Sequence, residues 1–595
     1  MNSATSTAFA PKPLGIVQEK DFLYSRDGGV KLESGEFLPE VNIRYETYGN
    51  FREGKSPVIW ICSPLTADAH AAGYLSEDPR SVGWWDALIG SGKAIDTDIF
   101  FVVCSNILGG CRGTTGPSSI DPRTKKTYGA EFPRFTITDM VKVQKLLAEH
   151  LKIEKIFAVL GGSMGGFQAI TWALEYPDFV EKCAVIASGT QLSSQAIGFE
   201  IIGRNIILSD ENFNGGNYSA EKKPAKGLSN ARQVAHITYL SPESMQNKFD
   251  HTKDSPNNPK NFYTGFALEN YLNHQGEKFV DRFDANSYLH LTWAMDNFNL
   301  EKKYGTLENA VSRLKAEFLN VHLSSDWLFT PAESYRLTFA LLNKKKIVTS
   351  VELNTTLGHD GFLLEVSDLG AVVSRFLDIR LPEKRNENFT KSAFSSVEDI
   401  SRISAFVPKG ASVLDIGCGD GRLLDALWRT NQVTGVGFDR SFEGVLHCLD
   451  YNVPVIQQDL DKNGLARIAD NSFDVVVFNR TLQEVQNPKE VLREILRIGK
   501  QAVVTFPNFG NWKVRKDILL SGRMPKSKSL PYEWYSTPNI HLFTLSDFNA
   551  LCKDENIKIK VLEFVNNGFL SGLFTRLNLA NLGAEQVIAL ICKES

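Results

Sequence analysis

A serine set between glycines is the feature that most restricts how this chain can fold. It lies in the segment Leu-Gly-Gly-Ser-Met-Gly-Gly at 160–166, which follows a strand-like apolar run and precedes a helical stretch ending near Glu175. The spacing Gly161-x-Ser163-x-Gly165 is that of a strand-to-helix turn so tight that only small residues fit two positions either side of the serine. The segment therefore predicts a parallel sheet covered by helices, with Ser163 raised from the sheet as a candidate nucleophile.

The rest of the chain repeats this alternation of strand-like and helical stretches. The rhythm stops between about residues 193 and 298, which predicts a helical cap inserted over the sheet. Because 595 residues exceed one hydrophobic core, we expect two domains joined by the charged, proline-containing stretch 381–387. The first, over 1–380, is of α/β-hydrolase type, and the second, over 388–595, is doubly wound and Rossmann-like. Strands are predicted at 58–62, 99–104, 156–160, 183–187 and 318–323 in the first domain, and at 412–416, 433–438, 453–457 and 475–478 in the second.

A nucleophilic serine needs a base and a carboxylate that orients the base, and in this fold they follow the serine in the order acid, then histidine. Asp326 directly follows a predicted strand, and His359 lies in a glycine-flanked loop after another. Loops at one edge of a parallel sheet can bring three such residues together. The oxyanion of the reaction would be bound by two backbone N–H groups, those of Met164 and Leu65. The alternative for Asp326 is a turn-forming role, and for His359 a packed loop residue.

The overall composition excludes several classes of function. With a formal net charge of −4 and no long basic stripe, the chain is not expected to bind nucleic acid. Its eight cysteines are scattered without C-x-x-C pairs, which predicts neither a zinc site nor a disulfide framework, and no metal is expected. No signal peptide and no apolar run long enough for a membrane helix is evident. We therefore expect a cytoplasmic protein without a membrane partner.

A set of short segments in the first domain carries a family likeness: Gly83-Trp-Trp-Asp86, Ile95-Asp-Thr-Asp98, Ser105-Asn-Ile-Leu-Gly-Gly-Cys111, Thr115-Gly-Pro-Ser-Ser119, Gly161-Gly-Ser-Met-Gly-Gly166, Ala235-His-Ile-Thr-Tyr239, Arg282-Phe-Asp-Ala-Asn286 and Gly358-His-Asp360. Together they resemble homoserine O-acetyltransferase, the MetX family, over about residues 14–378. The resemblance implies that Ser163 takes an acetyl group from acetyl-CoA and passes it to the hydroxyl of L-homoserine, with His359 as base. It also implies a homodimer formed through the cap.

The same resemblance assigns substrate contacts to Arg232 and Asp360, which suit the carboxylate and the ammonium of an amino acid. A structural ion pair is the alternative for Arg232, and it is equally open for Arg204, the other candidate on the cap. Relatives that use succinyl-CoA tend to carry arginine two residues after the triad aspartate, where this chain has Leu328. An apolar residue there favours acetyl over succinyl, because it leaves a second carboxylate uncompensated.

The second domain opens with a glycine-rich turn, Val413-Leu-Asp-Ile-Gly-Cys-Gly-Asp-Gly421, between a predicted strand and a helix. Such a turn lets the backbone approach a nucleoside cofactor. It resembles the S-adenosylmethionine motif of class I methyltransferases, and further segments between residues 457 and 541 resemble the methionine-biosynthesis protein MetW over about 388–595. The position that normally binds ribose falls on Gly437, so Asp439 is the substitute. The candidate cofactor residues are Asp415, Gly417, Gly419, Gly421, Asp439 and, by resemblance, Asp459.

Several alternatives stay open at this point. The first domain could be an esterase that uses the same triad, a homoserine O-succinyltransferase, or a serine O-acyltransferase; a non-catalytic scaffold is the reading from another class. The second domain shows no evident catalytic base. It could therefore methylate a substrate, or it could bind its cofactor as a module that regulates the acyltransferase.

Overall fold

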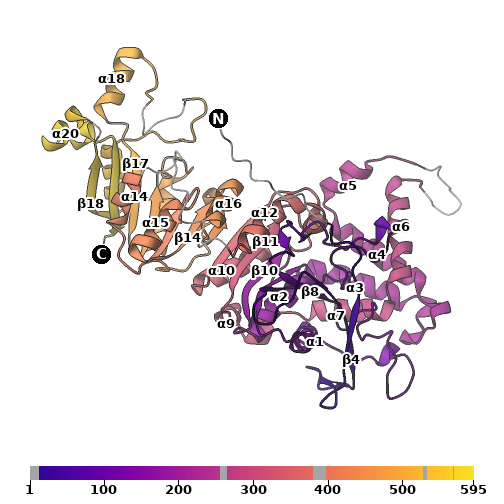
Figure 1. The fold of residues 1–595 in the computed structure, drawn as a ribbon. Helices are drawn as coiled ribbons and strands as arrows, with labels where there is room; N and C mark the ends of the chain where they lie inside the picture. Colours follow the sequence, from indigo (N-terminus) through magenta and orange to yellow (C-terminus); the bar gives the residue numbers. More distant parts are fainter. Residues whose placement is uncertain are drawn as a thin grey trace, which may run out of the picture. The chain divides into compact units, whose positions relative to one another are not determined.

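The computed structural model describes residues 13–254, 264–379, 397–462, 464–526, 533–566 and 568–594. The chain divides into two compact units, Met1–Leu377 and Asp378–Ser595, each built around its own sheet (Figure 1). The predicted linker at 381–387 lies outside the described residues.

The sheet of the first unit is mostly parallel, with the order β1-β4-β8-β5-β9-β10-β11-β12. Among its described strands, the antiparallel pairs are β1 with β4 and β4 with β8. The central strand β5 is buried along its whole length, as expected for a strand covered by helices on both faces. The bounds are β1 (Lys20–Tyr24), β4 (Val41–Tyr48), β8 (Phe101–Ser105), β5 (Val58–Cys62), β9 (Ile156–Gly162), β10 (Val180–Ile186), β11 (Glu317–Leu323) and β12 (Val348–Leu353), with two small sheets of β2 (Val30–Lys31) and β3 (Phe37–Leu38), and of β6 (Ile89–Gly90) and β7 (Ile95–Asp96).

Helices of the first unit either cover the sheet or form the cap. The covering helix α1 begins with a reciprocal capping box between Thr136 and Asp139, which satisfies the free N–H groups of its first turn. The cap helices α3 to α7 lie together on one side of the strands, in the region predicted at 193–298 (Figure 1). The covering and short helices are α1 (Ile137–His150), α2 (Met164–Glu175), α8 (Leu300–Tyr304), α9 (Leu307–Ser312), α10 (Pro331–Asn343), α11 (Gly361–Leu364) and α12 (Val366–Phe376); the cap helices are α3 (Ser194–Leu208), α4 (Ala225–Tyr239), α5 (Pro242–Phe249), α6 (Ala267–Arg282) and α7 (Ala285–Asp296).

The second unit is a doubly wound sheet with the order β15-β14-β13-β16-β17-β19-β18. Its first five strands are parallel, and β19 and β18 complete the sheet in antiparallel fashion. The strands are β13 (Ser412–Ile416), β14 (Thr434–Asp439), β15 (Val455–Gln457), β16 (Val475–Asn479), β17 (Ala502–Pro507), β18 (Ile557–Val565) and β19 (Gln586–Lys593). The helices are α14 (Val397–Ser404), α15 (Arg422–Asn431), α16 (Phe442–Asp450), α17 (Pro488–Ile498), α18 (Trp512–Ser521), α19 (Leu545–Asp554), α20 (Phe569–Arg576) and α21 (Ala580–Gly583).

The register of the first sheet decides where chemistry can occur. Cys62 at the end of β5 pairs with Gly161 near the end of β9, and Leu323 at the end of β11 pairs with Leu353 at the end of β12. The loops that follow these four strands therefore leave the sheet at the same edge. This is where the predicted nucleophile, acid and histidine lie along the chain.

Candidate active site

Ser163 occupies the turn between β9 and α2 in a conformation that side chains rarely adopt, with φ 57° and ψ −127°. Two glycines make this turn possible. A Cβ atom at Gly161 would lie 2.0 Å from the carbonyl oxygen of Gly165, and one at Gly165 would lie 2.3 Å from the carbonyl oxygen of Cys62. The glycines thus let the helix start pack against β5 and β9, which leaves the serine raised from the sheet.

The side chains of Asp326, His359 and Ser163 form one hydrogen-bonded line. The Nε2 atom of His359 lies 2.8 Å from the Ser163 hydroxyl oxygen, and its Nδ1 atom lies 2.7 Å from Oδ2 of Asp326. All three residues are buried. The structure therefore brings together the three residues that order and loop position predicted, in the arrangement of an activated nucleophile.

The carboxylate of Asp326 is held rigidly by its own loop. Its Oδ1 atom accepts the backbone N–H groups of Leu328 and Phe329, each at 2.9 Å, which leaves Oδ2 for His359. Burial disfavours a charge on the His359 ring, yet the neighbouring Asp326 carboxylate outweighs burial and raises the pKa of that histidine. The ring is thereby prepared to accept a proton from Ser163.

Aromatic rings close the site around the histidine. Phe329 stacks on the His359 ring at a centroid distance of 5.2 Å, and Phe362 meets it edge-on at 5.5 Å. Phe329 also contacts Phe167, which stacks on Phe298. These rings surround the acceptor with apolar surface, where electrostatic interactions are stronger than in water.

The two backbone donors predicted for the oxyanion lie on adjacent segments. Met164 is the first residue of α2, where the N–H groups have no partner within the helix. Leu65 is buried in the loop after β5, and the carbonyl of Ser63 in that loop accepts a 3.0 Å hydrogen bond from the Gln168 side chain of α2. Sequence reasoning missed Gln168. Its spacing from Ser163 indicated only a helix position, and its role depends on the approach of a distant loop.

Arg232 is a buried arginine of α4 whose contacts are with aromatic rings. Its guanidinium lies 4.7 Å from the centroid of Phe279 and 5.2 Å from that of Tyr239, whose hydroxyl is 3.5 Å from Nη1. Within the described part of the chain it forms no ion pair, so the structural alternative weighed for it finds no partner there. Asp360 follows His359 directly, and burial raises the pKa of its carboxyl although Arg232 and His359 oppose that effect.

Arg204 has a different environment from Arg232. It forms an ion pair with Asp296 on α7, and this buried pair lies beside Glu200. Burial, with the Asp296 charge, raises the pKa of Glu200 to about 8. This ion pair fits the structural alternative for Arg204, while its Nη1 atom is buried without a hydrogen-bond partner among the described residues. Tyr239 was given no role in the sequence analysis. It lies seven residues after Arg232, two helical turns along the same face of α4, and this spacing could have indicated that the two side chains are neighbours.

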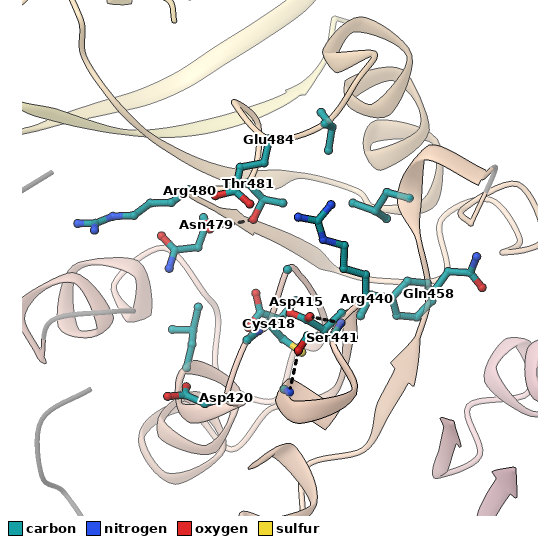
Figure 2. Close-up of a pocket in the computed structure, with 18 of the residues that line it drawn as sticks. Asp415, Cys418, Asp420, Arg440, Ser441, Gln458, Asn479, Arg480, Thr481 and Glu484 are labelled. Carbon is teal, nitrogen blue, oxygen red and sulfur yellow. Dashed lines mark hydrogen bonds between the residues drawn. The ribbon is translucent and has the colours of Figure 1, made fainter. Parts of the chain in front are cut away.

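The second unit has a cavity of about 590 Å³ beside its glycine-rich turn. Figure 2 shows Asp415, Cys418 and Ser441 on one side of this cavity and Asn479, Thr481 and Glu484 across from them. Of the predicted cofactor residues, Asp415, Gly417, Gly419, Asp439 and Asp459 line the cavity. Gly421 lies outside its lining and caps the start of α15 with φ 75°, a backbone conformation that favours glycine.

One position in this cavity corrects the sequence prediction. Strand β14 continues to Asp439, so the strand end that normally binds ribose is this aspartate and not Gly437. A Cβ at Gly437 would lie 2.4 Å from Sγ of Cys418, which explains the glycine. The Asp439 carboxylate accepts the N–H of Gly419 at 2.7 Å and that of Ser441 at 2.8 Å, which fixes it beside the turn.

Asp415 is the least satisfied carboxyl group of the cavity. It is buried, and neither of its oxygens has a hydrogen-bond partner among the described residues. Burial, with the charges of Asp439 and Asp420, raises its pKa to about 8. Carboxyl groups outnumber arginines around the cavity, which suits a cationic ligand better than an anionic one. The acidic lining residues are Asp415, Asp420, Asp439, Glu443, Asp459, Asp461 and Glu484, and the basic ones are Arg422, Arg440, Arg480 and His447.

Across the described ranges, no group of three or more His, Cys, Asp or Glu residues is arranged to hold a metal ion. In the same ranges, no helix combines the length and apolar character needed to cross a bilayer.

Comparison with known proteins gives a relative for each unit and for the whole chain. Residues 80–352 match the α/β hydrolase fold, and residues 397–590 match the methionine biosynthesis protein MetW. The bifunctional methionine biosynthesis protein MetXA/MetW of Rhodopirellula baltica is 40% identical over 572 residues, which cover 94% of this chain and 90% of that protein.

Two solved structures resemble the first unit. Homoserine O-acetyltransferase from Bacillus anthracis is 28% identical with a TM-score of 0.58 and covers 61% of this chain and 98% of its own. Esterase E22 is 31% identical with a TM-score of 0.57 and covers 61% of this chain and all of its own. Since one is an acetyltransferase and the other an esterase, the shared fold alone does not separate the two reactions.

Proposed function

The chain belongs to the homoserine O-acetyltransferase family, in the bifunctional form that carries a MetW domain, and on that premise we propose that its first unit transfers acetyl from acetyl-CoA to L-homoserine through an acyl-Ser163 intermediate. The observation that carries the proposal is the line from Asp326 through His359 to Ser163, with hydrogen bonds of 2.7 and 2.8 Å. The product is O-acetyl-L-homoserine, an intermediate of methionine biosynthesis.

In the first half-reaction, Ser163 Oγ attacks the thioester carbonyl of acetyl-CoA while its proton passes to Nε2 of His359. The N–H groups of Leu65 and Met164 stabilise the negative charge that develops on the carbonyl oxygen. The C–S bond then breaks, and CoA leaves as a thiol with the proton from His359. In the second half-reaction the homoserine hydroxyl gives its proton to His359, attacks the acyl-serine, and restores the Ser163 hydroxyl.

Recognition of homoserine is proposed for Arg232 and Asp360. The buried guanidinium of Arg232, held between aromatic rings, would bind the substrate carboxylate with its planar fork. Asp360 would bind the substrate ammonium, and that cation would favour the charged form of a carboxyl whose pKa is raised by burial. Serine has the same two groups but a shorter side chain. O-acylation of serine is therefore the alternative, and it differs from the proposal only in the length of the acceptor's side chain.

For the acyl donor we propose acetyl-CoA over succinyl-CoA, because position 328 is a leucine that offers no charge to a second carboxylate. The test compares turnover of the two thioesters by the purified protein at equal concentration. Faster release of CoA from succinyl-CoA would overturn this assignment.

Hydrolysis is the reaction that the same triad would perform if water replaced homoserine, and the likeness to esterase E22 makes it the second candidate. Release of free CoA from acetyl-CoA, measured with and without homoserine, separates them. We expect release beyond one equivalent per active site to depend on homoserine. Equal release in buffer alone would identify a hydrolase.

For the second unit we propose that the cavity binds S-adenosylmethionine as a regulatory module. Asp439 would hold the ribose, the Gly417–Gly421 turn would approach the nucleoside, Asp459 would lie on the adenine side, and Asp415 would face the cationic amino-acid end. The cofactor supplies an activated methyl group in methyltransferases. Calorimetry of the full chain with S-adenosylmethionine tests the proposal, and absence of binding heat would eliminate it.

Two further properties follow from the family and the surface. We propose a homodimer through the cap, supported by exposed apolar residues on α3 and α4: Ile201, Ile202, Leu208 and Ile237. Sedimentation of the wild type and of Ile202→Asp checks this, and a monomeric wild type would contradict it.

We also propose a cytoplasmic location, because all eight cysteines are free thiols.

A further inference from the structure

The loop after β5 connects the oxyanion donor Leu65 to a buried histidine, His70. Near Leu65 the loop is closed on itself by a 3.1 Å hydrogen bond from the Ser63 hydroxyl to the carbonyl of Asp68. Asp68 also accepts the backbone N–H of His70 at 3.0 Å. A displacement of His70 is therefore transmitted to the segment that contains Leu65.

The ring of His70 lies between two groups that can only accept hydrogen bonds. Its Nδ1 atom is 3.1 Å from both carboxylate oxygens of Glu46 on β4, and its Nε2 atom is 2.7 Å from the carbonyl oxygen of Ser81. A neutral imidazole has one donor and one acceptor nitrogen, so only the doubly protonated ring satisfies both partners. With Glu46 ionised, this geometry pairs His70, as an imidazolium, with a carboxylate that is fully buried.

Tyr48 extends this ion pair to the backbone of the loop. Its hydroxyl donates to Oε2 of Glu46 at 2.7 Å and accepts the N–H groups of Ala71 and Ala72 at 2.9 and 3.1 Å. Strand β4 thus holds the loop at three consecutive residues, by an ion pair and by two hydrogen bonds from backbone N–H groups to the Tyr48 hydroxyl. Buried networks of this kind fix one geometry when every member is satisfied.

We propose that His70, held as an imidazolium between Glu46 and the carbonyl of Ser81, is a positioning residue for acyl transfer that sets the place of the Leu65 N–H in the oxyanion site. The proposal rests on the proposed function of the first unit. Among the described residues, the hydrogen bonds of His70 go to Glu46, Ser81 and Asp68 and not to the triad, so it acts through the loop. Small displacements of such a donor matter, because oxyanion stabilisation depends on donors lying about 2.7–3.1 Å from the charge.

The charge on His70 makes the positioning of the loop after β5 sensitive to pH. Burial disfavours the imidazolium, but the hydrogen bond and charge of Glu46, together with the Ser81 carbonyl and Asp68, outweigh burial and raise its pKa. Asp68 in turn faces Arg112 at 3.3 Å. When pH rises through this pKa, one ring nitrogen loses its proton and faces an acceptor with a lone pair. The loop then loses one of its anchors, so acylation slows on the alkaline side.

The experiment follows the burst of CoA released from acetyl-CoA without homoserine, which reports acylation of Ser163 and excludes titration of the homoserine amine. The full-length variants are His70→Ala, His70→Gln and Glu46→Gln. The control is His150→Gln, at the exposed end of α1. Burst amplitude counts correctly folded sites, so a smaller rate at unchanged amplitude separates positioning from loss of fold.

We expect His70→Ala to slow acylation at least about tenfold, less than the roughly 10²–10³-fold cost of removing an oxyanion donor outright. His70→Gln, which has donors but no proton to lose, should recover part of the rate and lack the alkaline decline. Glu46→Gln should move that decline to lower pH, because the carboxylate raises the pKa of His70. The proposal is overturned if the His70 variants acylate at the wild-type rate, or if only their amplitudes fall. A wild type without a burst would instead contradict the proposed function.

Discussion

The two units place their buried carboxylates in opposite situations. In the first, Asp326 is surrounded by donors: two backbone N–H groups and the ring of His359. In the second, Asp415 is as deeply buried but has no donor among the described residues, and its pKa is raised to about 8. The first arrangement is complete before substrate arrives, as catalysis requires, whereas the second leaves a buried carboxyl group open to a donor from the proposed ligand. The comparison suggests a criterion: a catalytic carboxylate has its hydrogen bonds satisfied within the protein, whereas a carboxyl group proposed to bind a ligand does not.

The sharpest way to break this comparison is to remove the nucleophile. Ser163→Ala should lower homoserine-dependent CoA release by about 10⁵–10⁶-fold, because the covalent route is lost while binding remains. Binding of S-adenosylmethionine to the same variant, measured by calorimetry, should not change. A residual rate near wild type would mean that another group carries the acyl chain.

Asp326→Asn tests whether the satisfied carboxylate controls the histidine. We expect a loss of about 10⁴-fold in kcat, since the asparagine favours the wrong tautomer of His359. The wild-type rate should fall as pH falls through the raised pKa of His359, because the protonated ring cannot accept the Ser163 proton. In the variant that acid decline should move to lower pH. An unmoved pH profile would show that Asp326 does not set this pKa.

Arg232→Met sharpens the comparison within the first unit. It should raise KM for homoserine, with a loss in kcat/KM of about 100-fold, because a charged hydrogen bond contributes roughly 1.5–3 kcal/mol. KM for acetyl-CoA should change little. Arg204→Met is the matched variant: it removes the partner of Asp296, so it should lower thermal stability more than homoserine affinity. If both variants raise KM for homoserine equally, the distinction between them is wrong.

Asp415→Asn tests the proposed cofactor site of the second unit and has the smallest expected effect. We expect about tenfold weaker binding of S-adenosylmethionine, within the range for a hydrogen bond to a charged group. In the wild type, affinity should rise as pH rises through about 8, because the cation prefers the carboxylate form. Below that pH, binding should release a proton, detectable by calorimetry in buffers of different ionisation enthalpy. Asp554→Asn, on the exposed end of α19, is the control and should leave affinity unchanged.

Local spacing predicted the fold class, and the resemblance of short segments to known families predicted the family; both predictions are confirmed. The spacing around Ser163 specified the elbow because two glycines have no room for a Cβ, a constraint that is visible along the chain itself. The cap was predicted because the alternation of strand-like and helical stretches stops between about residues 193 and 298. The antiparallel strands β1 and β18 were not predicted, because edge strands are half exposed and lack the continuous apolar runs of central ones.

What sequence could not provide were contacts between distant segments. The pairing of Arg204 with Asp296 depends on how α3 packs against α7, which no local pattern encodes. The ribose-binding position was placed at Gly437, two residues before the observed end of β14, and the structure needs a glycine there because a Cβ atom would meet Cys418. The groups on the two sides of the His70 ring, Glu46 and the carbonyl of Ser81, come from other segments of the chain, so no local pattern could indicate its role.

Leu328 gives the last consequence. Its side chain occupies the position proposed to select the acyl donor, but it supports Asp326 only through its backbone N–H. Any residue except proline can supply that N–H. The side chain at position 328 can therefore change, and with it the preferred thioester, while the hydrogen bond that holds Asp326 is kept.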